Sequence, residues 1–302
     1  MFKTILITGA TGTQGGAVIR AIAALPRSEF TILALTRDIN SQSSKNLVKK
    51  YPTVKLVAGD LNAPDDIFKT IDSPVWGVFS VQTPFGKAAS LESEVTQGKG
   101  LVNAALRNNV KHFVYSSVDR GGPRSDEGEP SPVPHFETKR QIEDHLRLQA
   151  DNSEMGYVIL RPVFFMENLT DDMQGKLIAA AWRMSVDPKR LQLVAISDIG
   201  HFATQAFAKP DEYVGRAISI AGDELTHQEA SSIMRVQTGS ALPTGSSFLA
   251  WLLLRAVKDL RFMFRWFRED GYGADISLLR REYPGLQNFE TWVSLNRKER
   301  RV

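Results

Sequence analysis

The chain has 302 residues, of which 42% are hydrophobic and 24% charged, ordinary values for a globular protein with one large or two modest domains. Its 37 Lys and Arg residues barely exceed its 34 Asp and Glu residues, so charge alone points neither to nucleic acid nor to an anionic membrane. Because the chain has 0 cysteines, disulfides, thiolate metal sites and cysteine nucleophiles are excluded.

Short β-branched segments alternate with longer segments of helical periodicity in the first half of the chain. The expected strands are residues 4–8, 31–36, 54–58, 75–81, 111–116 and 157–160. The expected helices are residues 14–25, 42–50, 65–70, 91–108 and 135–149. Several strands are nearly continuous in apolar residues, as strands covered on both faces are. This alternation predicts an α/β fold with a doubly wound parallel sheet.

The alternation stops at residues 120–134, where prolines, glycines and acidic residues predict a surface loop. After residue 161 the alternation of strand-like and helical segments becomes irregular. Residues 217–220 still predict a strand, and a helix is expected over 228–238 with Thr226 as its N-cap.

Residues 248–268 have the spacing of an amphipathic helix. We expect this helix to pack on its own domain, and a membrane-surface or partner-binding helix is the alternative. The longest apolar run without charge is 248–254, far below the roughly 18 residues of a membrane-spanning helix, so no membrane span is expected. The basic residues of 296–302 predict a solvated tail, with a nuclear localisation signal as the alternative.

A glycine-rich loop follows the first expected strand and opens the first expected helix, with Gly9, Gly12 and Gly15 in the spacing G-x-x-G-x-x-G. In a dinucleotide-binding turn, Gly9 allows the tight turn, Gly12 lets the backbone approach a pyrophosphate, and Gly15 lets the helix pack close to the strand. The free N–H groups of the helix would hold the phosphates. The alternative is a glycine turn that binds nothing. A Walker loop is excluded because no Lys-Ser or Lys-Thr follows.

The second expected strand ends in Leu35-Thr36-Arg37-Asp38. An acid at this end usually binds the ribose 2′-hydroxyl of NAD, whereas a guanidinium can grip a 2′-phosphate, so Arg37 favours NADP(H). The alternative is that Arg37 pairs with Asp38 or a helix neighbour on the surface. Asp60, after the third expected strand, is placed for the adenine end, and an ordinary turn aspartate is its alternative.

With the glycine loop, five further segments resemble the NmrA-like family, atypical members of the short-chain dehydrogenase/reductase superfamily. They are Val114-Tyr115-Ser116-Ser117-Val118, His135-Phe136-Glu137-Thr138-Lys139, Arg161-Pro162-Val163-Phe164-Phe165-Met166-Glu167-Asn168-Leu169, Ala221-Gly222-Asp223-Glu224-Leu225-Thr226 and Gly271-Tyr272-Gly273-Ala274-Asp275. The resemblance covers nearly the whole chain. It implies a Rossmann-type NADP(H)-binding domain over residues 1–156 and a smaller C-terminal α+β domain for substrate or partner over 157–302, partly interleaved with the first.

The resemblance also implies which residues bind the cofactor. The adenosine diphosphate half would be held by the glycine loop and Arg37, and Lys139 and Asn168 would approach the nicotinamide end. The loop residues are Gly9, Thr11, Gly12, Thr13, Gln14 and Gly15.

Ordinary dehydrogenases of the superfamily donate a proton from a tyrosine four residues before a lysine. Here His135 stands at the tyrosine position, and Lys139 follows one helical turn later. Ser116, at the end of the fifth expected strand, lies where open α/β sheets contact ligands. The candidate catalytic residues are therefore His135, Lys139 and Ser116, with an imidazole able to donate near neutrality. The alternative is that His135 has no chemical role.

The family includes both NADPH-dependent reductases and redox-sensing regulators, so membership leaves two hypotheses. We expect an NADPH-dependent oxidoreductase that reduces a small carbonyl or conjugated substrate. The alternative is a non-catalytic NADP(H) sensor that binds a transcription factor or another protein, and the missing tyrosine favours it. We expect a cytoplasmic protein, with the nucleus as the alternative, and no direct binding to nucleic acid.

Overall fold

The computed structural model describes residues 2–26, 29–86 and 89–299, and contacts within the chain divide it into two compact units. The first unit comprises Met1–Ser117, Thr138–Arg161 and Ile199–Ile218, and the second comprises Val118–Glu137, Pro162–Asp198 and Ser219–Val302. The chain therefore passes between the units repeatedly, and each unit is built from segments far apart in sequence.

In the described ranges, seven strands form the larger sheet, in the order β3-β2-β1-β4-β5-β6-β9. They are β1 (Lys3–Ile7), β2 (Phe30–Thr36), β3 (Lys55–Ala58), β4 (Gly77–Ser80), β5 (His112–Ser116), β6 (Gly156–Pro162) and β9 (Ala217–Ile220). The strand pairs from β3 to β6 are parallel, which confirms the doubly wound α/β fold. The order reverses between β1 and β4, and open α/β sheets bind ligands at such a switch point.

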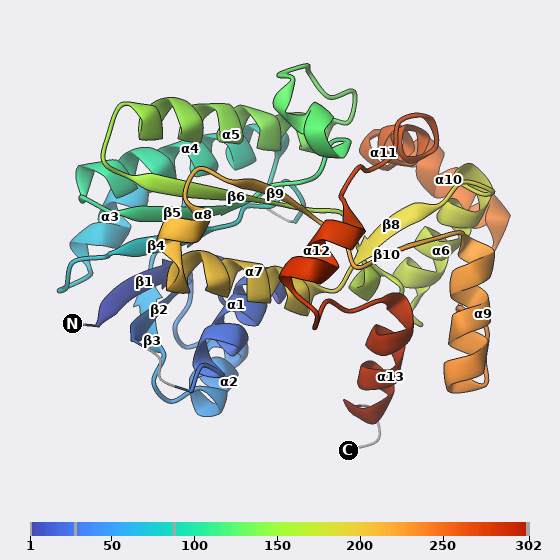
Figure 1. Ribbon diagram of the computed structural model, residues 1–302, viewed down its shortest axis with the longest axis horizontal. Helices are drawn as coiled ribbons and strands as arrows, with labels where there is room; N and C mark the ends of the chain where they lie inside the picture. Colours follow the sequence, from blue (N-terminus) through green and yellow to red (C-terminus); the bar gives the residue numbers. More distant parts are fainter. Residues whose placement is uncertain (1, 27–28, 87–88, 300–302) are drawn as a thin grey trace. The chain divides into compact units, whose positions relative to one another are not determined.

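Helices cover both faces of this sheet, with α3, α4 and α5 on one face and α1, α2 and α7 on the other (Figure 1). The bounds are α1 (Thr13–Ala23), α2 (Gln42–Lys50), α3 (Pro64–Lys69), α4 (Leu91–Arg107), α5 (Pro134–Asp151), α7 (Ile196–Ala208) and α8 (Pro210–Tyr213). The first five lie within two residues of their predicted bounds. Strand residues such as Phe113 and helix residues such as Leu101 and Ile142 bury one another in a common apolar core.

A second sheet in the described chain has the order β10-β8-β7. Its strands are β7 (Phe164–Phe165), β8 (Leu191–Val194) and β10 (Asp223–Leu225). The surrounding helices are η1 (Gly122–Asp126), η2 (Met166–Asn168), α6 (Met173–Ser185), α9 (His227–Thr238), α10 (Ser247–Ala256), α11 (Lys258–Glu269), α12 (Ile276–Glu282) and α13 (Phe289–Glu299). The predicted N-cap is confirmed, because Thr226 accepts a hydrogen bond from the backbone N–H of Glu229. Strands this short carry too little periodicity to be predicted.

The prediction of a surface loop over 120–134 is wrong for its first part. Arg120 and Gly122 are buried, next to the fully buried Asp119. The Asp119 carboxylate accepts hydrogen bonds from the backbone N–H groups of Gly121, Gly122 and Gly273. These bonds compensate the burial of polar backbone, which a loop normally avoids by staying in solvent.

The prediction of one helix over 248–268 is also wrong, because Val257 is extended and separates α10 from α11. The break has a packing reason. With 100° of rotation per residue, one straight helix would place Ala250 and the buried side of α11 about 120° apart, so the two could not face the same core.

The expected tail is helical as far as Glu299, and residues 300–302 lie outside the described residues. No helix in the described part of the chain is long and apolar enough to cross a membrane.

Candidate functional site

The glycine loop lies at the switch point, between the end of β1 and the first turn of α1. Gly9 has φ of +58°, a conformation that favours glycine. A Cβ on Gly15 would lie 2.3 Å from the carbonyl oxygen of Gly9, so a larger residue there would push α1 away from β1. These are the turn and packing roles that the spacing of the glycines predicts.

The start of α1 is open to an anion. Its N-cap is Gly12, and no side chain caps the helix, so the N–H groups of the first turn have no side-chain acceptor. Thr11, Gly12 and Thr13 are exposed. An accessible, uncapped helix N-terminus combines free N–H groups with the positive end of the helix dipole, which suits a pyrophosphate.

Arg37 follows β2 directly and is exposed. It forms no hydrogen bond or ion pair with any residue in the described ranges. Asp38, its expected alternative partner, instead accepts a hydrogen bond at 2.8 Å from the backbone N–H of Asn40. The hydroxyl of Thr36 lies 3.1 Å from that of Ser44 in the first turn of α2. The Arg37 guanidinium is therefore accessible to a ligand, as binding of a 2′-phosphate requires.

Asp60 is exposed at the end of β3 and closes a turn of its own. Its Oδ1 accepts from the backbone N–H of Asn62 at 2.8 Å, and its carbonyl accepts from that of Ala63 at 3.0 Å. This is the geometry of an ordinary turn aspartate. The adenine contact stays a prediction.

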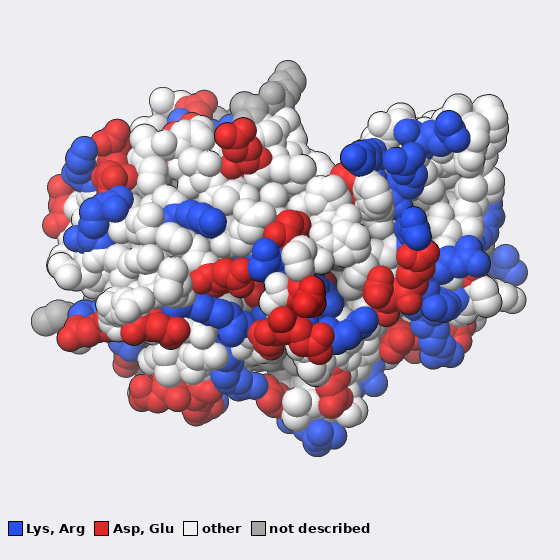
Figure 2. Space-filling view, turned by 90° about the horizontal axis from the view of Figure 1, so that it is seen from above, with Lys and Arg blue, Asp and Glu red and all other residues white. Residues whose placement is uncertain are grey.

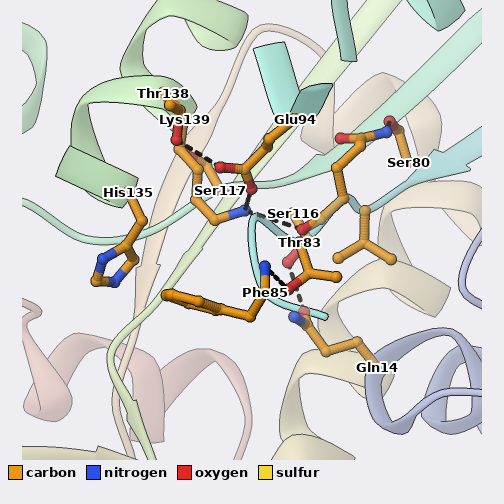
Figure 3. A network of polar contacts seen from close by, with 12 residues as sticks. Gln14, Ser80, Thr83, Phe85, Glu94, Ser116, Ser117, His135, Thr138 and Lys139 are labelled. Carbon is orange, nitrogen blue, oxygen red and sulfur yellow. Dashed lines mark hydrogen bonds and ion pairs between the residues drawn. The ribbon is translucent and has the colours of Figure 1, made fainter. Parts of the chain in front are cut away.

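Lys139 on α5 is held by a buried carboxylate on α4 (Figure 3). Its Nζ lies 2.9 Å from Oε1 of Glu94, and it donates to the carbonyl oxygen of Gln82 at 3.3 Å. Glu94 is fully buried, and its other oxygen accepts from the hydroxyl of Thr138. The ammonium is thereby fixed beside the carboxyl end of β4, next to the switch point.

Ser116 joins the end of β5 to the glycine loop. Its Oγ donates to Oε1 of Gln14 at 2.6 Å, and Gln14 belongs to the first turn of α1 (Figure 3). The next residue, Ser117, donates to Glu143, which also receives Arg161 at 3.2 and 2.6 Å. Arg161 and Glu143 are both buried. We read this second cluster as structural, because every member bonds to another member.

His135 lies in the first turn of α5, one turn before Lys139. Its Nδ1 is 2.5 Å from Oδ2 of Asp259, and its backbone N–H donates to Oδ1 of the same carboxylate at 3.2 Å. The two side chains are 12% and 16% exposed. A carboxylate this close to Nδ1 can orient an imidazole, although the two atoms do not have hydrogen-bond geometry.

Each of the three predicted catalytic residues has its own contacts: Ser116 with Gln14, Lys139 with Glu94 and Gln82, and His135 with Asp259. Ser116 and Lys139 lie at the carboxyl end of the sheet in the first unit, and His135 begins the helix that carries Lys139. Asn168 is exposed at the end of η2 in the second unit. Its approach to a nicotinamide stays a prediction.

Tyr272 does not replace the missing catalytic tyrosine. It packs against Phe136 and Trp266, with ring centroids 6.3 and 5.3 Å away. Burial raises the pKa of Tyr272 well above its usual value, and the charge of Asp119 raises it further. A catalytic tyrosine needs the opposite shift, towards neutrality.

Glu94 and Asp259 were not among the site residues predicted from the sequence. A signal for Glu94 existed, because it shares a buried stripe with Gly98, Leu101 and Ala105, where an acid is out of place. Asp259 gave no such signal, since it sits among basic residues and its partner His135 is 124 positions away.

Comparison with known proteins identifies relatives over most of the chain. The model of the NmrA-like family matches residues 1–283. An NmrA-like family domain-containing protein of Dictyostelium discoideum is 26% identical over 306 residues, covering 97% of each chain. The NAD(P)H azoreductase of Xenophilus azovorans is 26% identical over 238 residues, covering 78% of this chain and 74% of the relative.

Solved structures share the fold. NmrA, a negative transcriptional regulator, has a TM-score of 0.72 at 18% identity, covering 97% of this chain and 95% of its own. The triphenylmethane reductase of Citrobacter sp., complexed with NADP(H), has a TM-score of 0.72 at 18% identity, covering 97% and 99%.

Proposed function

Since the chain belongs to the NmrA-like family, we propose that it binds NADP(H) and uses NADPH to reduce a small carbonyl or conjugated substrate. The observation that carries the binding is the pairing of an uncapped helix start at the switch point with Arg37 at the end of the neighbouring strand. Gly12, Thr13 and Gln14 would hold the pyrophosphate, and Arg37 the 2′-phosphate. The NADP(H) bound by the triphenylmethane reductase supports this choice of cofactor.

Bound NADPH would supply a hydride to the substrate. The residues of the chain would hold the cofactor and manage the proton. Lys139 would bind ribose hydroxyls with the part of its ammonium that Glu94 and Gln82 leave open, since its side chain is 11% exposed. His135 would donate the proton from Nε2, with its ring held by Asp259.

The second candidate is the non-catalytic sensor. One observation favours it: His135 stands at the position that carries the proton-donating tyrosine in ordinary dehydrogenases. NmrA, a transcriptional regulator, shares the fold, so the fold is compatible with this role.

Turnover separates the two candidates. NADPH oxidation should be followed by the absorbance of the reduced nicotinamide. The acceptors to test are quinones, aldehydes, ketones, and the azo and triphenylmethane dyes that the names of the related reductases suggest. We expect one acceptor class to be reduced well above the rate without protein. NADPH binding at micromolar affinity with no turnover of any class would instead support the sensor.

A further inference from the structure

Helix α10 turns large apolar side chains to solvent. Phe248 is 65% exposed, Leu249 44%, Trp251 46% and Leu252 43%. Phe248, Trp251 and Leu252 have the i, i+3, i+4 spacing of one helix face, and the first two rings stack with centroids 6.1 Å apart. Among the ten residues of this helix, all of them described, Ala250 alone is buried. Apolar patches of this kind mark an interaction site.

Exposed basic residues run from the last turn of α10 along α11. All of the following are exposed: Arg255, Lys258, Arg261, Arg265 and Arg268. The guanidinium of Arg255 lies 5.3 Å from the Trp251 ring, so charge and aromatic surface meet at the junction of the helices. Figure 2 shows Lys and Arg side chains gathered beside an uncharged area in the region where Figure 1 draws α10 and α11.

Little acidic charge opposes these residues. Over α10 and α11 the sequence has five basic residues and two acidic residues, Asp259 and Glu269, and Asp259 pairs with His135. Arg265 pairs with Glu269 at 2.9 Å. Arg255, Lys258, Arg261 and Arg268 form no ion pair with any residue in the described ranges. Basic residues therefore outnumber acidic residues on these two helices, whereas they nearly balance over the whole chain, whose net charge is +3.

We propose that the α10–α11 face, made of the four apolar and five basic residues above, docks on an anionic lipid bilayer. The aromatic and leucine side chains would enter the interfacial region, and the basic side chains would contact lipid phosphates. Two features favour lipid over a protein partner. The apolar side chains project from a helix rather than line a groove, and the basic side chains beside them complement an anionic surface. This inference does not depend on the proposed reductase activity.

The test is co-sedimentation of the full chain with phosphatidylcholine vesicles that contain or lack phosphatidylserine, at low and high salt. We expect binding to the anionic vesicles alone, weakened by salt. Each basic residue at an anionic surface is worth about a fivefold change in partition, so Lys258→Glu with Arg261→Glu should weaken binding at least about 25-fold. Phe248→Ser with Trp251→Ser should also weaken it. The matched control is Arg235→Glu with Val236→Ser on α9, where both residues are exposed and Val236 is 80% exposed.

A second readout does not depend on the folding of these variants. Brominated lipid should quench part of the tryptophan fluorescence of the parent chain, and Trp251→Phe should remove that quenched part while leaving vesicle binding largely intact. Equal binding to both kinds of vesicle, or equal loss in the α9 control, would overturn the proposal. So would self-association that depends on Trp251 in the absence of vesicle binding, because the occupant would then be a second copy of the chain.

Discussion

Lys139 and Glu94 form an ion pair with Nζ 2.9 Å from Oε1, in which the carboxylate is fully buried and the lysine side chain 11% exposed. The pair joins α5 to α4 beside the carboxyl end of the larger sheet. Lys139 therefore neutralises a buried charge as well as standing where a ribose would bind. Its effects on stability and on cofactor binding have to be measured separately.

Glu94→Gln should lower the free energy of unfolding by about 3 kcal/mol, because it leaves a largely buried ammonium without its counter-charge. Urea denaturation measures this loss. The matched control is Asp65→Asn, which removes the carboxylate of an ion pair with Arg107 whose side chains are 56% and 50% exposed. That change should cost at most about 1 kcal/mol. Equal losses in both variants would mean that the burial of Glu94 does not matter.

Gly15→Ala should destabilise the fold by about 2 kcal/mol or more, since the new Cβ would lie 2.3 Å from the Gly9 carbonyl oxygen and backbone must move. Gly16→Ala is the control one residue later, where a Cβ would lie 3.5 Å from the carbonyl oxygen of Ala10. Because alanine favours a helix over glycine, Gly16→Ala should be neutral or stabilising by up to about 1 kcal/mol. Thermal unfolding measures both variants. If Gly15→Ala were the more stable of the two, α1 would not pack closely on β1.

Arg37→Ala should weaken NADPH binding about ten- to hundredfold, as expected for the loss of a charge-assisted hydrogen bond worth about 1.5–3 kcal/mol. NADH lacks the 2′-phosphate, so its affinity should not change. Calorimetry with both cofactors makes the comparison. Arg20→Ala, an exposed arginine in the last turn of α1, is the control. An unchanged affinity of Arg37→Ala for NADPH would remove Arg37 from the site.

The strands and helices of the first unit could be predicted because most of them are long enough to show the apolar periodicity of a strand or a helix. Residues 42–50 and 217–220 match α2 and β9 residue for residue. In the second unit α9 and its N-cap Thr226 were predictable, but the small sheet was not, since β7 and β10 have 2 and 3 residues. The same limit applies to the site. Residue types and spacing pointed to Gly15 and Lys139, whereas the partners Glu94 and Asp259 depend on which helices meet, and no local pattern encodes that.

Stability should depend on pH through Asp198, which is buried in the second unit and accepts a hydrogen bond from the backbone N–H of Gln287 at 3.1 Å. Burial raises the pKa of Asp198 from 3.8 to about 7, with the charge of Glu167 adding to the shift. Between these values the folded chain keeps a proton that the unfolded chain releases. The free energy of unfolding therefore falls as pH rises towards 7, by about 1.4 kcal/mol per pH unit, and levels off above it.

Asp198→Asn removes this titration and keeps an acceptor for Gln287. From pH 5 to pH 7 the parent should lose about 2 to 3 kcal/mol relative to the variant in urea denaturation. The difference between the two chains cancels His112, whose pKa burial lowers to about 4 and whose contribution has the opposite sign. Parallel pH profiles for the two chains would show that Asp198 is charged in the folded state at pH 5.

Variants of Lys139 and His135 should distinguish NADPH binding from substrate turnover. Lys139→Ala should weaken NADPH binding under both candidate functions, because a ribose contact is lost whether or not a substrate is reduced. Its control is Lys111→Ala, which removes an exposed pair with Glu154. His135→Phe should leave NADPH affinity nearly unchanged, since the imidazole acts only when a proton moves to a substrate. If His135 is the acid, turnover should fall by roughly a hundredfold or more.

A second histidine variant shows whether the loss of turnover is specific to His135. His145→Phe is the matched control, because His145 lies on the same helix and bonds to Asn103 rather than to Asp259. An active His135→Phe preparation with the full rate of the parent would assign the proton to water or another residue, and the reductase proposal would then stand without its histidine.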